Sequence, residues 1–167
     1  RLRSGIAGVG LEVVAAAVDH VIAVVRPGDN ATYSLLAAER NIKIVVCERA
    51  EEGMGHSLAA AVAASPPNSH WVIALGDMPL IRPETIGGVV AAIEQGAAFA
   101  MPQHNAERGH PVGIHSRFRK DLLVLQGDAG ARAIIALHKS DVQLIHTEDP
   151  GVLIDVDTVA DYQNLSR

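Results

Sequence analysis

Short apolar runs alternate with polar, glycine-containing segments along most of the chain. Runs rich in valine, isoleucine and leucine predict strands at residues 21–25, 42–47, 71–75 and 142–145. Helical spacing or alanine-rich composition predicts helices at residues 31–39, 57–64, 83–95, 116–125 and 129–138. Because strands alternate with helices, we expect an α/β fold, a single-domain, Rossmann-like three-layer sandwich with a mainly parallel sheet.

The remaining pattern is less regular. Short strands are predicted at residues 97–101, 112–115 and 152–154, and further helices at residues 11–18 and 158–165. The polar segment 103–109 is predicted to be a loop, and residues 103–115 break the alternation, which indicates an antiparallel excursion. No internal repeat or interdomain linker is visible, so we interpret residues 1–167 as one domain.

The sequence VIALGDMPLI at residues 72–81 is the segment around which the chain is organised. Its unbroken apolar start is typical of a strand covered on both faces in a parallel sheet. Gly76 and Asp77 follow at once, and Pro79 ends the strand because proline has no N–H to donate. The carboxyl edge of such a sheet is where ligands bind, so Asp77 is a candidate ligand-binding residue. The alternative is that Asp77 only caps a turn.

Composition narrows the function classes. The chain has 167 residues, of which 49% are hydrophobic, enough for a sizeable core. The formal net charge of −5, with no basic run, argues against nucleic acid or a membrane surface as the main partner. The single Cys47 excludes an internal disulfide and favours a cytoplasmic location. Residues 1–18 imitate a signal peptide, but Glu12 interrupts the apolar run and favours an amphipathic helix.

Two glycine-containing loops carry candidate chemistry. The segment GMGHSL at residues 53–58 has glycines that allow a ligand to approach the backbone, and it opens a helix whose free N–H groups favour an anion. The alternative is a flexible loop followed by Ser57 as an ordinary N-cap. In RGHPV at residues 108–112, His110 lies between glycine and proline on a rigid turn, with a plain surface histidine as the alternative.

Two further segments are polar. In GDAGAR at residues 127–132, Arg132 faces a phosphate or else pairs with Asp128 at i,i+4 spacing, with Asp128 as a helix N-cap. In DVD at residues 155–157, Asp155 and Asp157 alternate with valine, so both carboxylates can point to one side. Together with Asp77 they suit Mg²⁺, which prefers carboxylate, phosphate and water oxygens. The sequence contains no zinc-binding HExxH, no G-x-S-x-G elbow and no Walker A motif.

Five motifs taken together resemble those of a known family. They are LGDMPLI at residues 75–81, GMGHSL at 53–58, RGHPVGI at 108–114, GDAGAR at 127–132 and DVDT with a following DY at 155–162. The chain resembles MobA-like nucleotidyltransferases, most closely the molybdenum cofactor cytidylyltransferases, from about residue 21 to the C-terminus. The resemblance implies a nucleotide-diphospho-sugar transferase type of fold. It also implies transfer of CMP from CTP to molybdopterin with release of pyrophosphate.

The resemblance also implies roles for particular residues. Mg²⁺ is expected on Asp77, Asp155 and Asp157, which are then the catalytic residues. The nucleotide is expected near Arg3, Gly53, Gly55, Ser57, Leu58 and Gly76, and a phosphorylated, pterin-type acceptor near Arg108, His110 and Arg132. A molybdoenzyme is the expected protein partner. The alternatives are guanylyl transfer from GTP to molybdopterin or another small phosphate, and a non-catalytic nucleotide-binding module.

The N-terminal region departs from this family pattern. The family begins with a glycine-rich LAAGxSxRMGxxK signature that wraps the triphosphate. Only residues 1–5, which include Arg3, match the tail of that signature, and its lysine is absent. Because the other motifs are intact, we expect residues to be missing from the start of this sequence. A chain that truly lacked the signature would hold an NTP poorly.

Overall fold

The computed structural model describes residues 14–39 and 42–156. Within them the chain forms two compact units. The two-stranded unit comprises residues 19–69 and 115–141, without the undescribed pair 40–41, and the five-stranded unit comprises residues 14–18, 70–114 and 142–156. No helix in the described ranges is long and apolar enough to cross a membrane. One domain over residues 1–167 stays a prediction.

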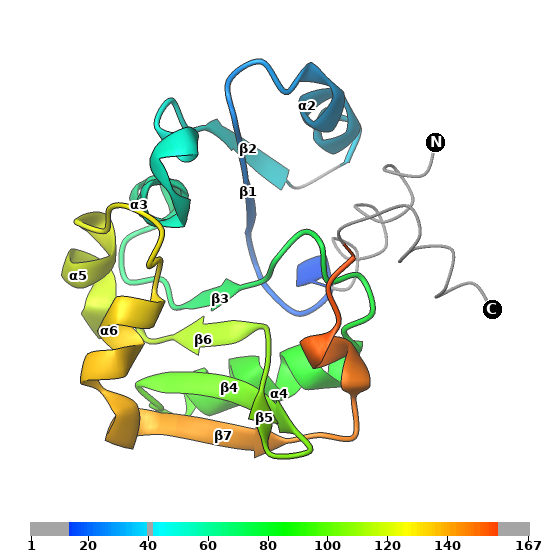
Figure 1. The fold of residues 1–167 in the computed structure, drawn as a ribbon, viewed down its shortest axis with the longest axis vertical. Coiled ribbons are helices and arrows are strands. Elements are labelled where there is room, and N and C mark those ends of the chain that lie inside the picture. The colour runs from blue at the N-terminus through cyan, green and yellow to red at the C-terminus, as the bar shows by residue number, and fades with distance from the viewer. Residues whose placement is uncertain (1–13, 40–41, 157–167) are drawn as a thin grey trace. The chain divides into compact units, whose positions relative to one another are not determined.

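The two-stranded unit is built on a parallel pair of strands (Figure 1). Strands β1 (Val21–Val25) and β2 (Ile42–Val46) are joined through helix α2 (Asn30–Ala37), in register from Val21 opposite Ile42. Helix α3 (Met54–Ala64) packs on both strands, and α5 (Arg119–Leu123) packs on α3. The unit also contains α6 (Arg132–Leu137) and the short 3₁₀ helices η1 (Ala50–Glu52), η2 (Ser116–Phe118) and η3 (Lys139–Asp141).

The five-stranded unit contains a mixed sheet. Its strands are β3 (Trp71–Ile73), β4 (Phe99–His104), β5 (Glu107–Arg108), β6 (Val112–Ile114) and β7 (Val142–His146). The order is β3-β6-β4-β5, with β7 paired to β4. Among the described strands of this unit, three pairings are antiparallel and only β4–β7 is parallel. The antiparallel excursion expected at residues 103–115 is therefore present.

Helix α4 (Pro83–Glu94) packs against this sheet (Figure 1). Val89, Ala92 and Ile93 are buried against Ala100 of β4. Pro83 sits in the first turn of α4, as the sequence predicts. The two glycines inside α4 have different surroundings. A Cβ added to Gly88 would make an ordinary contact with Ile145, and one added to Gly87 would meet nothing within 4 Å.

The strand that contains Val72 differs from the expectation. Strand β3 ends at Ile73, its residues are only half-buried, and in the described residues it pairs with β6 alone, in antiparallel fashion. The prediction that this segment is a strand of a parallel sheet, covered on both faces, is therefore wrong. An apolar run reports burial on average, but it carries no information about strand direction.

Three further element predictions are wrong. The loop expected at 103–109 is instead a hairpin, in which β4 and β5 are closed by Asn105 and Ala106 with positive φ. The strand expected at 152–154 is instead the 3₁₀ helix η4 (Pro150–Leu153), because the Asp-Pro-Gly start favours a turn. Helix α3 begins at Met54, three residues before the prediction. Residues 11–13 of the predicted helix 11–18, and all of 158–165, lie outside the described residues. In the described part of the first helix, residues 14–18, the N–H of Ala17 donates to the oxygen of Val14 at 3.0 Å.

Candidate functional site

Asp77 lies in the turn that follows β3, and its backbone is tied to a distant segment. The N–H of Val156 donates a 2.7 Å hydrogen bond to the main-chain oxygen of Asp77. Asp77 and Val156 are far apart in the sequence. Their hydrogen bond shows that the two backbone segments that contain them lie side by side in the five-stranded unit. Asp155 directly precedes Val156, and its side chain is exposed.

The Asp77 carboxylate suits a hard cation. Its Oδ1 atom is buried and accepts no hydrogen bond from any described residue. A buried carboxylate oxygen without a donor is costly unless a partner supplies positive charge, and Mg²⁺ prefers such oxygens. The residue type and its surroundings therefore fit a divalent cation.

The other expected ligands are only partly described. Asp157 lies outside the described residues, so its side chain cannot be placed beside Asp77 and Asp155. Among residues 14–39 and 42–156, no group of three or more histidine, cysteine, aspartate or glutamate side chains is arranged to hold a metal ion. The assignment of Asp77, Asp155 and Asp157 as cation ligands stays a prediction.

The loop of the RGHPV motif is anchored beside the same segment. The N–H of His110 donates to the oxygen of Val152 at 3.0 Å. A Cβ added to Gly109 would lie only 2.3 Å from that same oxygen, so only glycine fits there. His110 is half-buried, and Arg108 is exposed on β5 opposite Gln103. The five-stranded unit thus brings the loops of Asp77, His110 and Asp155 together, whereas acceptor binding by Arg108 and His110 stays a prediction.

Asp149 is a residue that the sequence analysis missed. It is 2% exposed, and its carboxylate accepts hydrogen bonds from the N–H of Arg82 at 2.8 Å, the hydroxyl of Thr85 at 2.7 Å and the N–H of Gly151 at 3.0 Å. Arg82 Nε also lies 3.8 Å from Oδ1. The turn signal Asp-Pro-Gly at residues 149–151 could have identified the local bond to Gly151, but not the contacts across 64 and 67 residues of sequence.

In the two-stranded unit, the glycines of GMGHSL pack against backbone. A Cβ added to Gly53 would lie 2.2 Å from the carbonyl carbon of Gly127, and one added to Gly55 would lie 2.8 Å from Gln126. The N–H of Gly55 also donates to the oxygen of Gly127 at 2.8 Å. These contacts join the GMGHSL and GDAGAR loops directly, which explains both glycines without a ligand. By contrast, a Cβ added to Gly76 would meet nothing within 4 Å.

Ser57 is not the N-cap of α3, so this alternative interpretation of Ser57 is wrong. The N-cap of α3 is Gly53, so Ser57 lies inside the helix, half-buried together with Leu58.

Charged side chains interact with one another around the start of α3. Arg49 donates two hydrogen bonds to Glu52, at 2.9 and 2.6 Å, and these hold the pKa of the Glu52 carboxyl below its usual range. His56 Nε2 lies 3.6 Å from the same carboxylate.

In the GDAGAR segment, the alternative in which Asp128 caps the helix and pairs with Arg132 is wrong. Helix α6 begins at Arg132 with Ala131 as its N-cap, so Asp128 does not cap it. Asp128 and Arg132 are both exposed, and in the described part of the chain they form no ion pair. A role for Arg132 in acceptor binding stays a prediction, and Arg3 lies outside the described residues.

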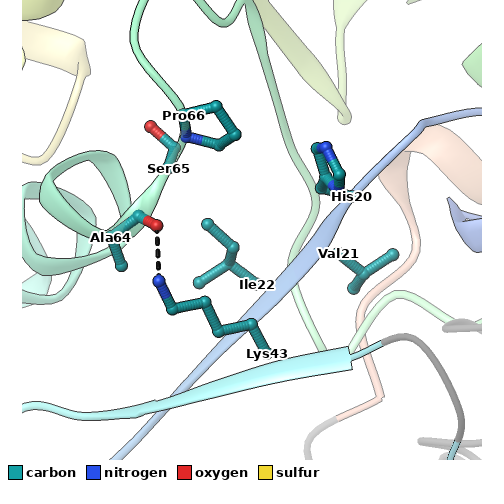
Figure 2. A pocket seen from close by; sticks show the side chains of 7 residues that line it. All are labelled: His20, Val21, Ile22, Lys43, Ala64, Ser65 and Pro66. Carbon is teal, nitrogen blue, oxygen red and sulfur yellow. Dashed lines mark hydrogen bonds between the residues drawn. The ribbon is translucent and has the colours of Figure 1, made fainter.

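A cavity of about 290 Å³ lies elsewhere in the two-stranded unit. Figure 2 shows its lining, in which Lys43 Nζ donates a 2.7 Å hydrogen bond to the oxygen of Ala64. The residues that line it come from the beginnings of β1 and β2 and the end of α3: His20, Val21, Ile22, Lys43, Ala64, Ser65 and Pro66. None of them belongs to the five motifs.

Known proteins of the same family resemble this chain. The MobA-like NTP transferase domain matches residues 7–143. The chain is 32% identical over 124 residues to the nicotine blue oxidoreductase of Paenarthrobacter nicotinovorans, a match that covers 70% of this chain and 61% of that relative. It is 27% identical over 158 residues to the purine catabolism protein PucB of Bacillus subtilis, which covers 89% and 76% of the two chains.

Solved structures with the same fold are also similar. The manganese complex of Rv0371c from Mycobacterium tuberculosis has a TM-score of 0.81 and 25% identity, covering 96% of this chain and 85% of that one. The 4-diphosphocytidyl-2C-methyl-D-erythritol synthase of Anaerococcus prevotii has a TM-score of 0.77 at 15% identity, covering 97% and 89%. These neighbours confirm the predicted α/β fold of the nucleotide-diphospho-sugar transferase type. With a family match over residues 7–143, the chain belongs to the MobA-like NTP transferase family, as its motifs predicted.

Proposed function

We propose that this chain moves CMP from CTP to a phosphorylated, pterin-type acceptor, molybdopterin being the expected one, and releases pyrophosphate. Membership of the NTP transferase family supports nucleotidyl transfer in general. The observation that carries the assignment of the site is the hydrogen bond from Val156 to the Asp77 backbone, together with the buried, unpartnered Oδ1 of Asp77. Both are expected where the turn after β3 and the segment after η4 share a cation.

In this proposal Asp77, Asp155 and Asp157 hold a divalent cation, with Mg²⁺ as the expected ion. A cation held there would supply positive charge against the charge that builds up on the phosphoryl oxygens during transfer. A phosphate oxygen of the acceptor forms the new bond to the α-phosphorus of CTP, and the bond from that phosphorus to the bridging oxygen breaks. Pyrophosphate leaves with the bonding electrons, and no protein nucleophile is required.

The remaining residues would orient the two substrates. The loop of Gly53 and Gly55, at the start of α3, would lie near the nucleotide, as the family resemblance implies. Arg108, exposed in the five-stranded unit, can offer its guanidinium group to the acceptor phosphate in a bidentate fashion. The role of Arg132 in acceptor binding rests on the family resemblance alone. His110, held by its bond to Val152, would contact the acceptor from a fixed position. An acceptor of this kind is consistent with a molybdoenzyme as the final partner.

The test is steady-state kinetics of pyrophosphate release with CTP, Mg²⁺ and molybdopterin as the acceptor. We expect Asp77→Ala to lower turnover by on the order of 10²–10³-fold, the scale of losing one preorganised electrostatic stabiliser. The matched control is Asp121→Ala, which removes an exposed carboxylate in α5 and should leave turnover unchanged. Near-normal turnover of Asp77→Ala would contradict the assignment.

The same assay distinguishes the alternatives. Preference for GTP over CTP, in turnover and in calorimetric binding, would select guanylyl transfer. Nucleotide binding without pyrophosphate release from any acceptor would select a non-catalytic module.

The relative at 32% identity is described as a nicotine blue oxidoreductase, which gives a second candidate function, oxidoreduction. That match covers only 61% of the relative, so its activity does not transfer directly to this chain. Consumption of a nicotinamide or flavin reductant by the purified protein, independent of CTP and unaffected by Asp77→Ala, would select this candidate. We expect no such consumption.

A further inference from the structure

Asp149 joins two segments that run side by side in the five-stranded unit. The N–H of Val156 bonds to Asp77, and at the far end the Asp149 carboxylate bonds to the N–H of Arg82. Between these contacts, a Cβ added to Gly151 would lie 2.3 Å from the oxygen of Leu80. The segments 77–82 and 149–156 are therefore antiparallel and in contact along their length.

The Asp149 carboxylate is buried and bonded at both oxygens. One oxygen accepts from the Arg82 N–H and the Thr85 hydroxyl, and the other accepts from the Gly151 N–H. Its negative charge also lies at the start of α4, where the helix dipole favours an anion. A buried carboxylate with this many donors is rigid, because breaking any one bond leaves a buried polar group unpaired.

Neither oxygen of Asp149 is free for a cation ligand role, since both are occupied by protein donors. Asp149 lies six residues before Asp155 in the sequence. Its carboxylate accepts a hydrogen bond from Arg82, which lies five residues after Asp77. Groups that hold metal ligands in place commonly change metal affinity when they are removed.

We propose that Asp149 is a positioning residue, which keeps the backbones that carry Asp77 and Asp155 in register and so sets the separation of their carboxylates. This inference rests on the proposed function, in which those carboxylates share a divalent cation. Loss of the Asp149 bonds lets the two segments slip or separate, so the cation loses affinity before the fold is lost.

The test is calorimetric titration of the full chain with Mn²⁺, without nucleotide, at a temperature where every variant is folded. Asp149→Asn keeps the volume of the side chain but replaces one acceptor oxygen with a donor. We expect its Mn²⁺ affinity to fall by about 10-fold, the lower end for losing a partner outside the ligand shell. The control is Ile93→Val, which loosens the core under α4 far from these bonds and should bind Mn²⁺ as the wild type does.

A second variant covers the case in which Asp149→Asn does not fold. Thr85→Val removes one donor to the Asp149 carboxylate and leaves the other two. It should still bind Mn²⁺ more weakly than Ile93→Val does. Wild-type affinity in a folded Asp149→Asn, or in Thr85→Val if that is the variant that folds, would overturn the positioning role. A wild type that binds no Mn²⁺ would overturn the proposed cation site and the positioning role with it.

Discussion

At the scale of single residues, backbone contacts decide the surroundings of Asp77, Gly53 and Gly55. Asp77 is visible because it ends an apolar run beside a proline, and the structure puts its backbone against Val156. Gly53 and Gly55 are visible as unusual glycines, but the structure gives them another reason, which is direct contact with the backbone of the Gln126–Asp128 turn. A glycine signals a close approach without saying what approaches.

This contact predicts the effect of substituting Gly53. Gly53→Ala would force a Cβ to 2.2 Å from the Gly127 carbonyl carbon, at a φ of 129° that L residues rarely adopt. We expect the free energy of unfolding to fall by about 2–4 kcal/mol, from overpacking and backbone strain together. Urea denaturation measures it, with Gly76→Ala as the control, because a Cβ there meets nothing. Equal stability of the two variants would show that the loops are not in contact.

Glu52 gives a prediction about pH. Hydrogen bonds from Arg49, and the charge of that side chain, lower the pKa of the Glu52 carboxyl, with a smaller contribution from His56. The ionised pair therefore stabilises the fold above the unfolded pKa of Glu52, and this contribution is lost as the pH falls through the lowered, folded pKa. Titration of the carboxyl by NMR should show its pKa return toward the usual value in Arg49→Met. Lys120→Met, an exposed cation in α5, is the control and should leave that pKa unchanged.

At the scale of elements, the strong patterns were predicted well and the tight turns poorly. The strands β1 and β2 and the start of α4 at Pro83 were correctly predicted. Runs of β-branched apolar residues indicate buried strands, and proline is common in the first turn of a helix. The β4–β5 hairpin was missed because its turn uses Asn105 and Ala106 rather than an Asn-Gly pair. Segment 152–154 was predicted as a strand because three apolar residues do not distinguish a strand from a 3₁₀ turn.

Helix α4 offers a prediction at this scale. Gly87 lies inside the helix, is exposed and has open space where a Cβ would be. Gly87→Ala should therefore raise the free energy of unfolding by about 1 kcal/mol, the difference in helix propensity. Gly113→Ala is the contrasting variant, because its Cβ would lie 2.6 Å from Ile93 beneath the same helix, and it should destabilise. Thermal and urea denaturation would measure both changes, and a destabilising Gly87→Ala would contradict the open space.

At the scale of the whole molecule, motif order indicated the family more securely than element patterns indicated the sheet. Five short motifs predicted the MobA-like family, and the match over residues 7–143 confirms it. The direction of the β3 pairing was not predictable, because partners that are distant in sequence decide it. The hydrogen bonds of Asp149 were not predictable for the same reason, since its donors Arg82 and Thr85 lie 67 and 64 residues away in the sequence.

The location of the divalent cation is the central claim, and paramagnetic broadening by Mn²⁺ tests it most directly. Mn²⁺ added to the isotope-labelled protein should broaden the amide signals of Asp77, Asp155 and Val156 first, and excess Mg²⁺ should restore them. Asp77→Asn should abolish this local broadening at the same Mn²⁺ concentration. Broadening centred away from these residues, or unchanged in Asp77→Asn, would contradict the account.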